Sequence, residues 1–213
     1  MAVTLAGLDL AALLCSRVCH DLISPAGAIV NGLEVYEEAK DEETKVFALD
    51  LIRKSARTAS ARLQFCRIAF GAAGSAGAQI DVGDAETVAR GVIEDDKVKL
   101  VWNLPRVFLG KNRVKLLLNL LLVALQAIPR GGSLAVDPIG EGETMGFRVM
   151  AAGINARVPA VQDLLDGGGP DQIIDAHAIQ PYYTGLLARE CGLAARVRAE
   201  GDAIVVAAET PPV

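Results

Sequence analysis

Hydrophobic residues in the first third of the chain recur every three to four positions, which is the spacing of one face of an α-helix. From about Leu8 to Glu38, the apolar stripe contains Ala11, Leu14, Val18, Leu22, Ile29, Leu33 and Tyr36. From about Glu42 to Phe70, a second stripe contains Phe47, Leu49, Ile52, Ala56, Ala59, Leu63, Cys66 and Phe70. A short acidic turn separates the two stripes, with Asp41 at the N-cap position of the second. The pattern predicts two long helices in an antiparallel hairpin.

A hairpin of two such helices exposes too much apolar surface to stand alone. Two hairpins that pair into an antiparallel four-helix bundle would bury this surface. We therefore expect a homodimer that forms through residues 1–72.

After residue 72 the pattern changes. The small residues from Gly71 to Ala78 show no periodicity, which predicts a linker over residues 73–80. Residues 81–213 mix helical and strand patterns: helices at about 84–94, 111–128, 159–165 and 178–191, and strands at about 97–104, 133–137, 144–151, 194–199 and 203–208. This mixture predicts an α/β sandwich. The expected fold class is therefore α+β, with an N-terminal helical hairpin followed by an α/β domain.

Charge and composition narrow the class of protein. The formal net charge of −5 argues against nucleic acid as a partner. The most apolar run, Leu116 to Ile128, is too short to span a bilayer, and the N-terminus lacks the pattern of a signal peptide. The four cysteines show no disulfide spacing. We expect a cytoplasmic protein that does not bind membranes. Cys15 and Cys19 lie near a histidine, but no fourth ligand completes a metal site.

The candidate reactive group is His20, one of two histidines in the chain. On a helical wheel it shares a face with small or polar residues: Ser16, Ser24, Gly27 and Asn31. The apolar stripe lies on the opposite face, so we expect the imidazole to point to solvent and to leave room for another protein. An exposed histidine without a function is the commoner alternative.

Two neighbours strengthen the functional interpretation of His20. Pro25 lies five residues later, where its ring clashes with the Asp21 carbonyl and costs roughly 3 kcal/mol in a helix interior. We expect a bend that exposes the imidazole and frees local carbonyls, although a tolerated kink is the alternative. The Asp21 carboxylate can hold one imidazole nitrogen as N–H, which leaves the other as the nucleophile. A solvated helix residue is the alternative for Asp21.

These residues carry a resemblance. The run from His20 to Pro25, His-Asp-Leu-Ile-Ser-Pro, resembles the H-box of sensor histidine kinases. The run Leu116 to Ala124 resembles their N-box helix, but Val123 stands where those kinases have the Asn that binds Mg²⁺, and valine offers no oxygen ligand. Asn119 matches only the earlier, structural Asn. Ala151 replaces the Asp that contacts adenine, and Gly185 is what remains of the last glycine box. Core segments of an unrelated α/β domain are the alternative.

A hairpin H-box joined to an emptied ATP-binding fold resembles the ChpT-type histidine phosphotransferases of alphaproteobacteria, and the stretch 179–190 adds to the likeness. The resemblance implies a phosphotransferase in a phosphorelay of cell-cycle regulation. In such a relay, the receiver domain of a CckA-like hybrid histidine kinase donates a phosphoryl group to the histidine. The histidine passes it to CtrA-like and CpdR-like response regulators. An active sensor-type histidine kinase and a non-catalytic adaptor that docks receivers are the alternatives.

The resemblance also assigns roles to residues. The expected catalytic residues are His20 and Asp21, with Pro25 at the helix kink. The expected contacts with a receiver are Arg17, Ser16, Ser24, Gly27 and Asn31. No cofactor is expected on this chain, because receivers bring their own Mg²⁺.

Overall fold

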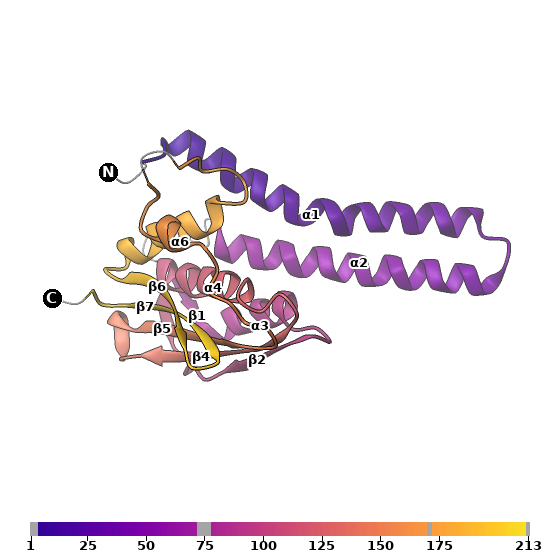
Figure 1. Cartoon of the computed structure of the whole chain (residues 1–213). Helices are drawn as coiled ribbons and strands as arrows, with labels where there is room; N and C mark the ends of the chain where they lie inside the picture. The colour runs from indigo at the N-terminus through magenta and orange to yellow at the C-terminus, as the bar shows by residue number, and fades with distance from the viewer. Residues whose placement is uncertain (1–3, 72–77, 170–171, 212–213) are drawn as a thin grey trace.

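Two long helices, α1 (Gly7–Glu38) and α2 (Glu42–Ala69), form a hairpin that projects from the rest of the molecule (Figure 1). The computed structural model describes residues 4–71, 78–169 and 172–211. The Asp41 carboxylate caps α2 by accepting a hydrogen bond from the Thr44 N–H at 2.8 Å. This cap satisfies an N–H group that has no partner within the helix. Both predicted helices and the predicted cap are confirmed, with helix ends within one residue.

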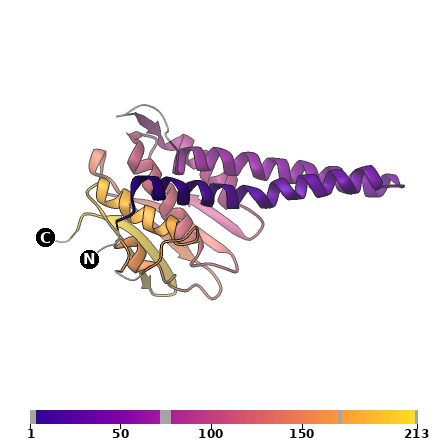
Figure 2. The ribbon, with the colours of Figure 1, turned by 90° about the horizontal axis from the view of Figure 1, so that it is seen from above.

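Helix α1 is bent (Figure 1). Its C-terminal part runs beside α2, whereas its N-terminal part diverges from α2 and lies over α6 (Ile179–Glu190), as the view from above also shows (Figure 2). There an apolar cluster joins the two domains, with Leu5, Leu10, Leu13 and Leu14 packed against Leu164, Ile174, Ile179 and Tyr182. The Leu5 N–H also donates a hydrogen bond to the Tyr182 hydroxyl at 3.4 Å. The start of α1 is therefore part of the contact between hairpin and second domain.

The second domain is built on a five-stranded sheet with the order β2-β4-β5-β7-β6. The strands are β2 (Val98–Trp102), β4 (Gly132–Ile139), β5 (Gly146–Ala152), β6 (Ala194–Glu200) and β7 (Ala203–Glu209). Only the β2–β4 pair is parallel. Helices α3 (Val82–Ile93), α4 (Lys111–Leu125) and α6 lie on the side of the sheet that faces the hairpin (Figure 1). The predicted fold class, a helical hairpin followed by an α/β sandwich, is confirmed.

Helix α4 lies at the centre of the hydrophobic core. Its residues from Val114 to Leu121 are buried on every side, between the sheet, α6 and the end of α2. A helix that is apolar all round is stable only in such an interior. Two polar residues interrupt this run, Lys115 and Asn119. Asn119 is fully buried and donates hydrogen bonds to the Ala69 and Lys115 carbonyls at 3.1 and 2.9 Å. Its Oδ1 accepts a bond from Gln180 at 3.1 Å, so Asn119 connects α2, α4 and α6. This agrees with the structural role expected for it.

Several short elements differ from the predictions. Strand β1 (Gln79–Asp81) pairs antiparallel with β3 (Phe108–Gly110), and neither was predicted, because three residues show no clear alternation. Strand β1 begins inside the expected linker 73–80, of which residues 73–77 lie outside the described part of the chain. The predicted helix 159–165 shortens to α5 (Gln162–Leu165), and a 3-10 turn, η1 (Gly142–Thr144), precedes β5.

Among the helices of the described residues, α1 alone has the length and apolar composition that would allow it to cross a membrane. It pairs with α2 and packs on α6 in this structure. These contacts use part of its apolar surface within the protein.

Candidate functional site

His20 lies on an open face of α1. Its side chain is 66% exposed. The neighbours predicted to share this face are also exposed: Ser16, Ser24, Gly27 and Asn31. A Cβ atom added at Gly27 would meet nothing within 4 Å, so no side chain of the protein rises above the helix backbone at this position. The predicted exposure of the imidazole is confirmed, and a second protein can approach it closely.

A carboxylate faces one nitrogen of the His20 ring. Asp21 Oδ1 lies 3.6 Å from His20 Nδ1, and Asp21 Oδ2 accepts a hydrogen bond from Arg17 Nε at 3.1 Å. Arg17 is therefore bound to Asp21 and holds the carboxylate in place. A negative charge at this position favours the tautomer with the proton on Nδ1, which leaves the lone pair on Nε2. The arrangement provides a nitrogen nucleophile with a defined tautomer.

Pro25 lies inside α1 and is buried, one turn beyond His20. Proline bends helices because it cannot donate to the carbonyl four residues earlier, which here is that of Asp21. In the structure, the Arg62 guanidinium of α2 donates a hydrogen bond to this carbonyl instead. Arg62 thus satisfies the group that Pro25 leaves free and ties α2 to the turn that carries His20. The sequence predicts the free carbonyl but does not indicate its partner.

The second histidine of the chain lies beside the first. The ring centroids of His20 and His177 are 5.6 Å apart, and the rings meet edge to face at 76°. His177 lies in the turn before α6, where the Asp175 carboxylate accepts hydrogen bonds from the His177 and Ala178 N–H groups at 2.9 and 2.8 Å. The sequence alone does not single out His177. No local pattern marks it, because the contact exists only through the packing of α1 on α6.

The region that resembles a nucleotide site is packed with apolar side chains. Val123 on α4 and Ala151 on β5 are fully buried in one hydrophobic cluster. Neither side chain offers an oxygen to Mg²⁺ or an acceptor to an adenine amino group. In the described part of the chain, no group of three or more histidine, cysteine or acidic residues is placed to hold a metal.

The remaining glycine of this region has a packing role. A Cβ atom at Gly185 on α6 would lie 2.0 Å from the Leu165 carbonyl oxygen, so α5 rests directly on the α6 backbone. Arg189 holds the same carbonyl with a hydrogen bond of 2.9 Å. The surface of Gly185 is occupied by the protein itself and cannot cradle a phosphate.

Comparison with known proteins agrees with this arrangement. Residues 82–203 match the family model of the histidine phosphotransferase C-terminal domain. The chain is 54% identical over 210 residues to the protein phosphotransferase ChpT of Brucella abortus (strain 2308), covering 98% of this chain and 99% of that protein. A solved structure of a bacterial phosphotransferase superposes with a TM-score of 0.88 at 53% identity, covering 98% of this chain and 100% of the other. The chain therefore belongs to the ChpT-type histidine phosphotransferases.

Proposed function

We propose that this phosphotransferase carries its phosphoryl group on His20 and passes it between receiver-domain aspartates in a multistep phosphorelay. The observation that supports this assignment is the exposed imidazole whose Nδ1 faces the Asp21 carboxylate at 3.6 Å. His20 is open to a partner, whereas the apolar interior of the second domain offers no equivalent reactive group.

In the forward step, the lone pair on His20 Nε2 attacks the phosphorus of an aspartyl phosphate on the receiver. The N–P bond forms as the P–O bond breaks, and the receiver's aspartate leaves as a carboxylate. The ring gains positive charge, which the nearby Asp21 carboxylate stabilises. The reverse step, with a second receiver, returns the imidazole to its starting state. The Mg²⁺ that neutralises the phosphoryl oxygens belongs to the receiver in this proposal.

The receiver would dock on the face of α1 around His20, through Arg17, Ser16, Ser24, Gly27 and Asn31. The small residues among them, Ser16, Ser24 and Gly27, let the backbone of the partner approach the imidazole. The partners that fit this chemistry are the receiver of a CckA-like hybrid kinase and CtrA-like or CpdR-like regulators. A relay among such proteins places this chain in the cytoplasm.

The decisive experiment incubates the purified protein with a receiver that carries a labelled aspartyl phosphate. We expect acid-labile label on the protein, and none after His20→Ala. The matched control is His177→Ala, which removes the other histidine and should still accept label. Label on His20→Ala would refute the assignment. Unlabelled protein that still binds the receiver would favour the adaptor alternative.

We also propose that the chain binds no nucleotide. The support is the burial of Val123 and Ala151 and the contact of Leu165 on Gly185. Titration of the protein with ATP and Mg²⁺ in a calorimeter should release no binding heat. Measurable heat together with self-labelling from ATP would instead show an active histidine kinase.

The quaternary proposal is a homodimer through the hairpin. Large apolar side chains remain exposed along it, including Ile23, Val30, Leu33, Phe47 and Leu63. A partner hairpin would bury them in a four-helix bundle. Light scattering should give the mass of a dimer, and Leu33→Glu combined with Phe47→Glu should give a monomer, since each change would place a charge in the bundle core. A monomeric wild-type protein would contradict this proposal.

A further inference from the structure

The ring of His20 needs a second constraint besides Asp21. The Nδ1–Oδ1 separation of 3.6 Å is longer than a hydrogen bond, so it attracts the ring without fixing its plane. An exposed side chain with so loose a contact changes rotamer on the nanosecond scale or faster. A nucleophile in that state would present Nε2 to an incoming phosphoryl group in only a fraction of encounters.

The edge-to-face contact with His177 supplies this constraint. At a centroid distance of 5.6 Å and an angle of 76°, the two rings lie in the favoured geometry of an aromatic pair. Asp21 attracts one edge of the His20 ring while His177 restricts its rotation. Together they define which nitrogen and which direction the ring presents to solvent.

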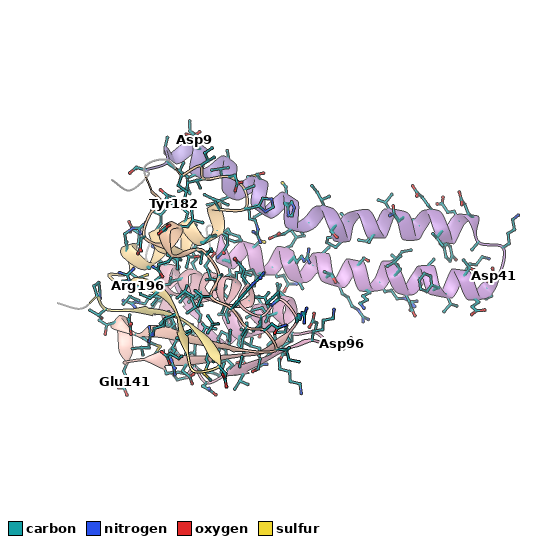
Figure 3. All side chains as sticks on the ribbon, in the orientation of Figure 1. Asp9, Asp41, Asp96, Glu141, Tyr182 and Arg196 are labelled. Carbon is teal, nitrogen blue, oxygen red and sulfur yellow. The ribbon has the colours of Figure 1, made fainter. Side chains whose placement is uncertain are left out.

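His177 is exposed, and its backbone is held by the turn before α6 and by the packing of the helix that follows. The Asp175 carboxylate fixes its turn through two backbone N–H groups. The following helix, α6, packs Ile179 and Tyr182 against Leu10 and Leu13 of α1. Tyr182 lies on the side of the second domain that faces α1 (Figure 3). The apolar contact between the domains therefore sets the position of the His177 backbone relative to the helix that carries His20.

We propose that His177 is a positioning residue that orients the His20 ring for phosphotransfer. This inference rests on the proposed function of His20 and adds a role for the second domain in the transfer step itself. His177 supplies no atom to the reaction. It raises the fraction of encounters in which Nε2 is aligned with the phosphorus. An aromatic edge-to-face contact corresponds to about a two- to tenfold effect on such a population.

The test measures single-turnover transfer from a labelled receiver at increasing receiver concentration. His177→Ala should lower the maximal rate by about two- to tenfold and leave the half-saturating concentration unchanged. His177→Phe should restore the rate, because a benzene ring makes the same edge contact. The remote control is Glu141→Gln, at the edge of the second domain away from the hairpin (Figure 3), which should behave like wild type. Thermal unfolding checks that each variant is folded.

Three results would overturn the inference. The first is a wild-type maximal rate in His177→Ala. The second is a change in half-saturation alone, which would make His177 a contact with the receiver. The third is rescue by His177→Asn but not by His177→Phe, which would assign the effect to an N–H group. If His20→Ala still accepts label, the proposed function fails as well. Loss of label in His20→Ala together with any of these three results removes only the role of His177.

Discussion

The turn of α1 around His20 differs in exposure and packing from the interior of the second domain around Val123 and Ala151. Around His20, small and polar side chains keep the helix surface low and open. Around Val123 and Ala151, apolar side chains fill the space between helix and sheet, and both residues have no exposed surface. The region around His20 is accessible but little packed. The region around Val123 and Ala151 is tightly packed and leaves no space for a ligand.

This contrast separates the proposed reactive surface on the hairpin from a second domain whose interior is filled. Filling the interior stabilises the sheet and α4, and α6 packs against α4. The turn before α6 carries His177 to the edge of the proposed phosphotransfer site. The second domain thus acts through its shape and its attachment to α1, and the proposed chemistry takes place on the hairpin.

Placing an acidic side chain in the packed region is the strongest way to test the contrast. Ala151→Asp would bury a carboxylate between Leu134 and Ile204 on the neighbouring strands, with no partner for its charge. An uncompensated buried charge costs about 3–5 kcal/mol, so we expect a large loss of stability without any gain of ATP binding. Chemical denaturation measures the change. The same substitution at the exposed Ala199 on β6 is the control and should cost within about 1 kcal/mol. A stable Ala151→Asp variant that binds ATP would show that the interior is still a nucleotide site.

Adding a methyl group to Gly185 tests the packing of the second domain at another point, where the Leu165 backbone rests on α6. The new Cβ would collide with the Leu165 backbone, which cannot move as a flexible side chain would. We expect a loss of about 1–3 kcal/mol in the free energy of unfolding. Gly91→Ala in α3 is the matched helix control, since its Cβ would meet Ala61 Cβ at an ordinary 3.5 Å. That variant should be unchanged or gain up to about 1 kcal/mol from helix propensity. Equal stability of the two variants would mean that α5 does not press on α6.

On the open face of α1, an added methyl group is expected to increase stability rather than reduce it. Gly27→Ala meets no neighbouring atom, so it should stabilise the helix by about 0.5–1 kcal/mol. The methyl group would also raise the surface on which we propose that the receiver docks, and the half-saturating receiver concentration should increase. Gly91→Ala again serves as the control, with a similar helix gain and no change in transfer. If Gly27→Ala transfers as well as wild type, the low surface at residue 27 is not needed by the partner.

Much of this architecture is predictable from periodicity because its elements are long or strongly patterned. The two hairpin helices and α4 have apolar faces that extend over many turns, and the turn at Asp41 carries a clear cap. The exposure of His20 follows from the same reasoning, since a wheel places its neighbours on one side. Strands β1 and β3 escaped prediction, because their stability comes from pairing with each other and with nearby loops.

The geometry of the site depends on contacts that no local pattern records. His177 meets His20 only because α1 bends towards α6, and Arg62 reaches the Asp21 carbonyl only because α2 lies alongside that turn. Both contacts join residues far apart in the sequence. Helical spacing predicts which face a residue occupies within its own helix, but it carries no information on which side chain of another element will face it.

The cysteines also differ between exposed and buried positions, and they give the test with the smallest expected effect. Cys15 and Cys19 are exposed near His20, whereas Cys66 is buried in α2 behind the same turn. Burial raises the pKa of the Cys66 thiol to about 11, and the negative charge of Asp21 adds to the rise. An unfolded thiol ionises near pH 9, so this residue's contribution to stability is complete below pH 9 and disappears as the pH rises towards 11. Relative to Cys66→Ala, wild type should lose about 0.4 kcal/mol between pH 7 and pH 9. Denaturation curves at the two pH values measure this difference, and a parallel pH dependence of the two proteins would show that water reaches Cys66.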